Sequence, residues 1–274
     1  MRQQPRVVLI TGASSGIGHA LANSFLAAGC LVVATARNIK SLENLEQSGA
    51  YPLSLDVTDT AACHHAIEHC IEKFGRIDVL VNNAGYGQIG ALLDLSDEQL
   101  HNQFAVNCVA PLRLCRLAAL RMTEQGSGLL VNIGSVSGIT VTPFAGAYCA
   151  SKAAFHALDD ALRMELAPFN VKVVTVQPGA IQSSFTKAAD QHLAPAGSLY
   201  NRYRAGIAKR AGMSQRNATP AKHLADYVVT RLLKTENPPA IIRFGYGARL
   251  LPLMSLLVPR RLRQRILSKT FGLC

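Results

Sequence analysis

The chain lacks tryptophan altogether, and only 6% of its 274 residues are aromatic. With so few rings for base stacking and no base-reading motif, nucleic-acid binding is a disfavoured function despite the net charge of +11. No internal repeat, low-complexity tract or linker divides the sequence. Because 49% of the residues are hydrophobic, the chain can build one sizeable core, and we expect a single domain over residues 1–274.

The chain also lacks a CxxC pair, and its cysteines are odd in number, at seven. Reduced thiols packed as small apolar groups are therefore expected rather than disulfides. A strand-like run begins near residue 6, which leaves no room for a signal peptide before it. The expected location is consequently cytoplasmic.

One histidine-rich run, CHHAIEHC at 63–70, raises the question of a metal site because His65 and His69 have helical i, i+4 spacing. Its apolar residues fall on the other side of the same helix and predict a buried stripe. That stripe consists of Cys63, Ala66, Ile67, Cys70 and Phe74. We therefore predict an ordinary amphipathic helix and no metal.

Short runs of β-branched and apolar residues recur along the chain, separated by helix-length patterns. The predicted strands are 6–11, 31–36, 52–55, 78–82, 128–133, 171–177 and 240–244. Alternation of strands and helices indicates an α/β fold with a parallel sheet and crossover helices.

The first of these strands runs into RVVLITGASSGIG at 6–18, where glycines stand at 12, 16 and 18. A helical pattern follows at once. Glycines at a strand-to-helix turn let the backbone approach a pyrophosphate, which then meets the positive end of the helix dipole. The run thus predicts a dinucleotide site, although its glycine spacing differs from the commoner GxGxxG.

The residue type at the end of the second predicted strand indicates whether a site prefers NAD or NADP. An NAD site normally places a carboxylate there for the adenosine ribose, whereas this chain has Ala36 followed by Arg37. A guanidinium suits the 2′-phosphate of NADP through charge-assisted contacts. We therefore expect NADP(H) as the cofactor, with Arg37 as its ligand.

Tyr148 and Lys152 lie four residues apart in YCASK, within a helical pattern. Side chains at i and i+4 share one face of a helix, so the ammonium is expected to lower the pKa of the phenol. A phenol so adjusted can exchange a proton near neutral pH.

Taken together, TGASSGIG, NNAG at 82–85, Asn107, Ser135, YCASK and QPG at 177–179 resemble the short-chain dehydrogenase/reductase family in order and spacing. The resemblance covers roughly residues 6–187. It implies a Rossmann-type doubly wound parallel sheet of about seven strands with helices on both faces, and a dinucleotide across the carboxyl ends of the strands.

The resemblance also implies individual roles. Tyr148 would be the general acid and base, Ser135 would orient the substrate carbonyl, Lys152 would hold the nicotinamide ribose, and Asn107 would hold a water in a proton relay. The implied cofactor residues are Gly12, Ser14, Ser15, Gly16, Ile17, Gly18, Arg37, Asp56, Val57, Asn83, Ala84, Gly85, Tyr148, Lys152, Pro178, Gly179, Ile181 and Ser183. An intact catalytic set favours an enzyme over a dinucleotide-binding sensor.

Residues 142–169 are most similar to the branch with 17β-hydroxysteroid dehydrogenases, retinol dehydrogenases and acyl-dihydroxyacetone-phosphate reductase, which act on bulky apolar ketones or alcohols. The alternative is a reductase of 3-oxoacyl thioesters. The expected substrate-contacting residues are Ser135, Val141, Phe144, Tyr148, Phe185 and Leu193.

Acidic residues almost vanish from the last third of the chain. Residues 191–274 carry 15 Lys and Arg against two Asp and Glu, so the whole excess of positive charge lies there. Residues 183–215 match the family's substrate lid, and its basic residues, Arg202, Arg204, Lys209 and Arg210, would favour a lipid with a phosphate or carboxylate.

The segment 245–274 is a basic and apolar extension, and its apolar run is too short, and too interrupted by Pro252 and Pro259, to span a bilayer. It suits either the surface of an anionic membrane or a helix packed over the substrate pocket with solvated arginines. The family resemblance further implies a homodimer or homotetramer formed through the YCASK helix and the helix near 97–125.

Overall fold

A computed structural model describes residues 4–183 and 194–273. Seven parallel strands form one sheet in the order β3-β2-β1-β4-β5-β6-β7. The strands are β1 (Val7–Ile10), β2 (Leu31–Ala36), β3 (Tyr51–Ser54), β4 (Val79–Asn82), β5 (Gly128–Ile133), β6 (Val171–Pro178) and β7 (Ile241–Phe244). All seven predicted strands are present with ends within one residue, and the doubly wound α/β class is confirmed.

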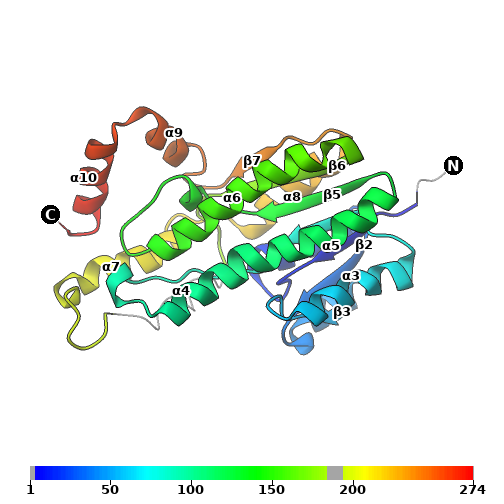
Figure 1. Cartoon of the computed structure of the whole chain (residues 1–274), viewed down its shortest axis with the longest axis horizontal. Coiled ribbons are helices and arrows are strands. Elements are labelled where there is room, and N and C mark those ends of the chain that lie inside the picture. The colour runs from blue at the N-terminus through cyan, green and yellow to red at the C-terminus, as the bar shows by residue number, and fades with distance from the viewer. Residues whose placement is uncertain (1–3, 184–193, 274) are drawn as a thin grey trace.

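Helices cover both faces of this sheet. The longer ones are α1 (Gly16–Ala27), α3 (Thr60–Phe74), α4 (Asp97–Phe104), α5 (Ala110–Glu124), α6 (Gly146–Leu166), α7 (Arg204–Gly212), α8 (Ala221–Leu233), α9 (Leu250–Leu257) and α10 (Arg260–Thr270), with the short α2 (Glu43–Gln47). Figure 1 shows α3, α5 and α6 in front of the sheet and α8 behind it. Two apolar layers result, because each strand contributes alternate side chains to opposite faces.

The layer behind the sheet joins Phe25 of α1 and Val228 of α8 to Ile10 and Val131 of the strands. The layer in front joins Ile67 of α3 and Leu114 of α5 to Leu9 and Leu80. The stripe predicted for 63–74 faces this second layer, with His64 and His65 exposed. The six cysteines among the described residues are buried free thiols, and burial raises the pKa of Cys70 and Cys115 to about 12.

The strand order reverses between β2 and β4, which flank β1 on its two sides. At such a switch point the crossover loops diverge and leave a crevice beyond the carboxyl ends of the strands. The glycine loop after β1 and the NNAG loop after β4 both end at this crevice. The helices α7, α9 and α10 gather at the same end of the molecule, opposite the N-terminus (Figure 1).

Candidate active site

Ser135 and Tyr148 meet at the carboxyl edge of the sheet. Ser135 follows β5 by two residues, while Tyr148 lies in the first turn of α6, and both are 8% exposed. A hydrogen bond joins the two side chains. A substrate oxygen held near both hydroxyls would therefore be oriented by one and protonated by the other.

The pKa of Tyr148 differs from the sequence prediction. Burial raises it above the ordinary value, while the hydrogen bond with Ser135 and the charge of Arg210 act in the opposite direction. The prediction that Lys152 lowers this pKa is therefore wrong for this structure. Desolvation of the ring disfavours the phenolate more strongly than the neighbouring groups favour it.

Lys152 lies one turn after Tyr148, and its ammonium points back to the sheet. Its Nζ donates a 2.7 Å hydrogen bond to the carbonyl oxygen of Ile133. Burial lowers the pKa of Lys152 to about 8, although the carboxylate of Asp159 opposes that shift. The amine is thus held at the end of β5 and close to the change of protonation state at neutral pH.

Asn107 occupies a π-helical turn, Ala105–Val109, between α4 and α5. Its Nδ2 donates to the carbonyl oxygen of Tyr86 at 2.8 Å, and its Oδ1 accepts from the Tyr86 backbone N–H at 3.1 Å. A Cβ added at Gly85 would lie 3.1 Å from this Oδ1 and 3.8 Å from the Nζ of Lys152. π-Helical turns are frequent at functional sites, and this one places the Asn107 amide and the Lys152 ammonium next to the same residue, Gly85.

The glycine loop lies against two other loops of the crevice. Gly12 and Gly16 have left-handed backbones, with φ of 65° and 57°, which glycine adopts without strain. A Cβ at Gly12 would come within 2.9 Å of the Cα of Ala84, and one at Gly16 within 3.0 Å of the Cβ of Ser183. The loops after β1, β4 and β6 therefore meet where a pyrophosphate would have to approach the backbone.

Asn83 fixes the glycine loop from the neighbouring strand. Its Nδ2 donates to the carbonyl oxygens of Thr11 and Gly12, both at 2.9 Å. In return, the hydroxyl of Thr11 accepts from the backbone N–H groups of Asn83 and Ala84 at 3.0 Å. Ser14 and Ser15 stay exposed at the start of α1, whereas Ile17 is half-buried.

Arg37 is exposed just beyond β2, as a ligand of an adenosine phosphate would have to be. Asp56 lies near it. Hydrogen bonds from Thr58 lower the pKa of Asp56, and the charge of Arg37 lowers it further. Val57 is buried with its side chain in the front layer of the core.

The loop after β6 carries the remaining predicted cofactor residues. Pro178 ends β6, and Gly179 is the next residue. The backbone after β7 lies so close to Gly179 that a Cβ there would be 2.1 Å from the carbonyl oxygen of Tyr246. Ile181 is buried, and the Ser183 N–H donates to the Oε1 of Gln215 at 3.3 Å. The structure thus brings these residues to the same edge as the glycine loop.

The predicted substrate residues do not behave alike. Val141 is 60% exposed, whereas Phe144 is buried with a left-handed φ of 62°. That backbone is strained for an aromatic residue and is sustained here by packing against Phe271 and Ile207. Phe185 and Leu193 lie outside the described residues.

Sequence reasoning missed His156, which lies on α6 one turn beyond Lys152. Its Nε2 accepts a 3.3 Å hydrogen bond from the Ser135 N–H, and a Cβ at either Gly134 or Gly138 would collide with its ring. Burial, followed by the Lys152 charge, lowers the pKa of His156 to about 4. The signal in the sequence was its i, i+4 spacing from Lys152.

Arg210 belongs to the basic lid, but the sequence did not distinguish it from its neighbours. It is 5% exposed, and its Nε donates to the hydroxyl of Thr142 at 2.7 Å. Its charge lowers the pKa of Tyr148. A buried cation close to the Tyr148 hydroxyl is thus part of the candidate site.

The family model of the short chain dehydrogenases matches residues 6–194. "Short-chain dehydrogenase ptmH" of Penicillium ochrochloron is 37% identical over 276 residues, with 98% of each chain covered. A 3-ketodihydrosphingosine reductase of Bacteroides thetaiotaomicron is 38% identical over 183 residues, which are 67% of this chain and 66% of that protein.

Solved structures agree with the fold. A short-chain dehydrogenase from Streptomyces avermitilis is 32% identical, has a TM-score of 0.82, and is matched over 93% of both chains. A metagenomic short-chain oxidoreductase in complex with NADP is 27% identical with a TM-score of 0.69, over 86% of this chain and 95% of that one. One from Burkholderia phymatum in complex with NAD is 23% identical with a TM-score of 0.76, over 86% and 88% of the two chains.

Proposed function

Since this chain belongs to the short-chain dehydrogenase family, we propose that it is an NADP(H)-dependent oxidoreductase that interconverts a ketone and a secondary alcohol. The observation that carries this proposal is the hydrogen-bonded pair of Ser135 and Tyr148, with the Lys152 ammonium beside them at the carboxyl edge of the sheet. Family membership supports an oxidoreductase with a nicotinamide cofactor. The preference for NADP and the substrate class are our proposal.

The residues present fit a nicotinamide dinucleotide. Two left-handed glycines, Gly12 and Gly16, leave the space that a Cβ would fill, and the 12-residue α1 begins at Gly16 without an acidic side chain in its first turn. Hydride transfer is the chemistry that such a group supplies when bound. Arg37 would hold the 2′-phosphate, and Lys152 the nicotinamide ribose.

Tyr148 would donate its proton to the oxygen of the ketone while the Ser135 hydroxyl orients that oxygen. Burial raises the pKa of Tyr148, which favours the protonated hydroxyl that a general acid needs. Lys152 and Asn107, which flank Gly85, would provide the path by which the proton is replaced.

We propose a bulky, apolar or lipid-like substrate. Apolar side chains of Phe144, Ile207 and Phe271 form one cluster with Cys149, which follows Tyr148 in sequence, and Val141 exposes an apolar side chain three residues before Phe144. The Bacteroides relative is named for a 3-keto substrate, 3-ketodihydrosphingosine. Its name supports a lipid-like ketone for this chain but does not decide between a steroid, a retinoid and a chain lipid.

Only one of the four basic lid residues supports recognition of an anionic group inside the site. Arg204 donates to the carbonyl oxygen of Ala194, Lys209 to that of Thr270, and Arg202 stacks on a tyrosine ring. Arg210 alone is buried and near Tyr148. It would favour a ketone with a phosphate or carboxylate over one with an amine.

The decisive variant is Tyr148→Phe, which keeps the ring and removes the proton. We expect kcat for ketone reduction to fall by at least about 100-fold, the usual contribution of a general acid, with the cofactor still bound. Steady-state assays and fluorescence titration with NADPH measure the two quantities. Near-normal turnover would contradict this mechanism, and NADPH binding without turnover of any substrate in the wild type would favour a sensor.

The substrate proposal requires a panel with the wild-type enzyme and Arg210→Gln. It should contain a steroid ketone, retinal, acyl-dihydroxyacetone phosphate, 3-ketodihydrosphingosine and a 3-oxoacyl thioester. We expect the wild type to prefer a neutral or anionic apolar ketone, and the variant to lose chiefly the anionic ones. Preference for the thioester would instead support the alternative, a 3-oxoacyl thioester reductase.

A further inference from the structure

The helix α9 exposes an apolar face that no described part of the chain covers. Leu250, Leu253, Leu256 and Leu257 are 69%, 50%, 80% and 68% exposed and recur at helical spacing. Its other side is anchored, because Pro252 is buried and the Thr140 hydroxyl hydrogen-bonds the Leu251 carbonyl at 2.9 Å. Leaving four leucines of one short helix in water is costly, which marks this face as an interaction surface.

The sequence on both sides of α9 is rich in arginine and contains no acidic residue. Residues 237–274 contain six arginines, one lysine and no Asp or Glu. Arg249 precedes α9, and the exposed Arg260 and Arg261 follow it at the start of α10. None of the ion pairs among the described residues involves these arginines.

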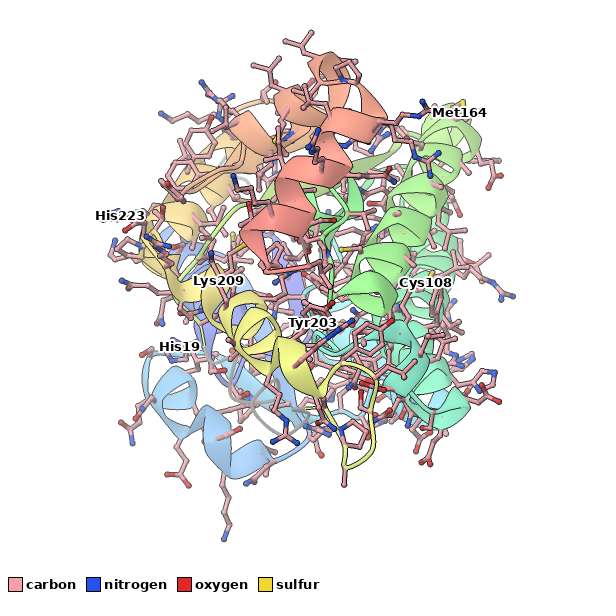
Figure 2. The ribbon with its side chains drawn as sticks, turned by 90° about the vertical axis from the view of Figure 1, so that its left-hand side faces the viewer. His19, Cys108, Met164, Tyr203, Lys209 and His223 are labelled. Atoms are coloured by element: carbon pink, nitrogen blue, oxygen red, sulfur yellow. The ribbon has the colours of Figure 1, made fainter. Side chains whose placement is uncertain are left out.

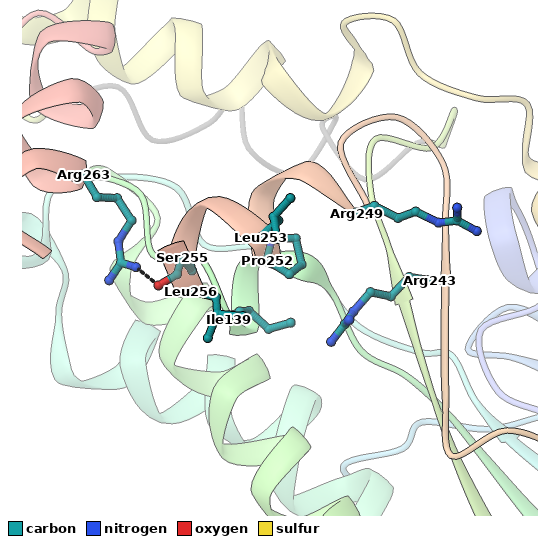
Figure 3. A pocket seen from close by; sticks show the side chains of 8 residues that line it. All are labelled: Ile139, Arg243, Arg249, Pro252, Leu253, Ser255, Leu256 and Arg263. Carbon is teal, nitrogen blue, oxygen red and sulfur yellow. Dashed lines mark hydrogen bonds between the residues drawn. The ribbon is translucent and has the colours of Figure 1, made fainter. Parts of the chain in front are cut away.

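A pocket of about 630 Å³ lies beside the same helix and is lined by both cationic and apolar side chains. Three arginines, Arg243, Arg249 and Arg263, line it together with Leu253 and Leu256 (Figure 3). Arg263 donates to the Ser255 carbonyl oxygen and Arg243 to the Gln177 side chain, and these hydrogen bonds hold two of the lining guanidinium groups in place. An anionic headgroup fits among these cations while the leucines enter an apolar phase.

We propose that α9, with the arginines around it, docks the protein on an anionic phospholipid membrane. Exposed apolar residues flanked by cations are the pattern of interfacial helices, in which burial of leucine and attraction to anionic lipid add together. Among the described residues, no helix combines the length and apolar character needed to cross a bilayer. The inferred association is therefore peripheral.

The docked helix would lie next to the segment between β5 and α6, which carries Ser135. Thr140, which bonds α9 through Leu251 and Ser255, is five residues after Ser135 and directly precedes the exposed Val141. If the proposed function on an apolar ketone is correct, such a substrate would reach the site from the bilayer without crossing water. The docking itself does not depend on that function.

The experiment is cosedimentation of the full-length chain with sucrose-loaded vesicles of phosphatidylcholine alone or with one third phosphatidylglycerol. We expect binding to the anionic vesicles only, weakened by salt. Leu256→Gln/Leu257→Gln should weaken partitioning by about tenfold or more, because two leucines lose their apolar phase. Arg260→Gln/Arg261→Gln should weaken it by about 30-fold, since each juxtamembrane cation contributes about 1 kcal/mol.

Two matched controls remove equivalent groups elsewhere. Leu93→Gln replaces a leucine that is 75% exposed between β4 and α4, and Lys40→Gln/Lys234→Gln removes two exposed charges outside residues 237–274. Both should bind vesicles as the wild type does. Circular dichroism and turnover of a water-soluble ketone check that every variant is folded.

Three results would overturn the proposal. They are absence of wild-type binding to anionic vesicles at low salt, equal loss in the controls, and sedimentation-velocity evidence that the leucine pair instead holds two copies of the chain together. Because vesicle binding is measured without turnover, failure of docking and failure of the proposed function are distinguishable.

Discussion

At the scale of single residues, the proposed preference for NADP depends on Arg37, the exposed cation beyond β2. Arg37→Ala should reduce the preference for NADPH over NADH by about 10- to 100-fold, since a hydrogen bond to a charged group contributes about 1.5–3 kcal/mol. Comparison of kcat/KM with the two cofactors measures this. Lys40→Ala, an exposed cation on the next turn, is the control. Equal efficiencies in the wild type would reject the NADP assignment.

His156 gives a pH-dependent prediction. Its folded pKa is about 4 against an ordinary 6.5, so only the unfolded chain takes up a proton between these values. Its stabilisation is complete above pH 6.5 and is lost as the pH falls toward 4. At pH 5 the loss is about 2 kcal/mol relative to pH 8.

The comparison that isolates this effect is between the wild type and His156→Gln, whose amide can still accept from the Ser135 N–H. Urea unfolding at pH 8 and pH 5 should show a larger loss of unfolding free energy in the wild type. Asp159 acts in the opposite direction, because burial raises its pKa to about 6, but it is common to both proteins. An identical pH dependence would contradict a buried, neutral imidazole.

At the scale of elements, the lid helix α7 and the C-terminal helix α10 are joined by backbone contact. A Cβ at Gly206 of α7 would lie 2.0 Å from the Phe271 carbonyl oxygen, and the Phe271 ring is 1% exposed. Lys209 adds a hydrogen bond to Thr270. Figure 2 shows α7, with Lys209 on it and Tyr203 directly before it, beside α10. The sequence left two alternatives for residues 245–274, packing over the substrate pocket or contact with a membrane. The end of this segment packs against Phe144 and Ile207 through Phe271, whereas α9 keeps an apolar face exposed.

Gly206→Ala tests this contact against helix propensity. Alanine is about 1 kcal/mol better than glycine within a helix, yet here we expect net destabilisation and faster hydrogen exchange over residues 260–273. Gly212→Ala, on the same helix with no atom within 4 Å of the added Cβ, should be neutral or stabilising. Equal effects of the two substitutions would show that the elements separate freely.

At the scale of the whole molecule, we expect a homodimer or homotetramer formed through α5 and α6. These helices expose apolar residues outward, among them Leu120 at 65% and Met164 at 72%, and Figure 2 shows Met164 at the end of α6 remote from α7. Ala150, Ala153 and Ala157 are exposed at helical spacing on α6 and permit close approach of a second helix.

Ala153→Arg should convert the oligomer to monomers, because a guanidinium cannot be accommodated between closely packed helices. Sedimentation equilibrium measures the mass, and Ser48→Arg, at an exposed position after α2, is the control. A monomeric wild type would show that this face is not used.

Local patterns in the sequence were sufficient for the strands, the class of fold and the family. Strand periodicity, glycines at a strand-to-helix turn and i, i+4 spacing on α6 depend only on neighbours along the chain. They therefore predicted the elements and the position of Ser135, Tyr148 and Lys152 at one edge of the sheet, where the structure has them. The same patterns could not give the sign of the Tyr148 pKa shift, because burial is a property of the packed molecule.

Only the tertiary structure decided which basic residue enters the site and which apolar face stays in water. Arg210 and Lys209 are neighbours in sequence, yet one is buried beside Tyr148 and the other is exposed. The ring of His156 is buried against Gly134 and Gly138, which are far from it in sequence. The helix α9 is anchored by the hydrogen bond from Thr140 to Leu251. Contacts between residues far apart in sequence are set by how whole elements pack, and no local pattern encodes them.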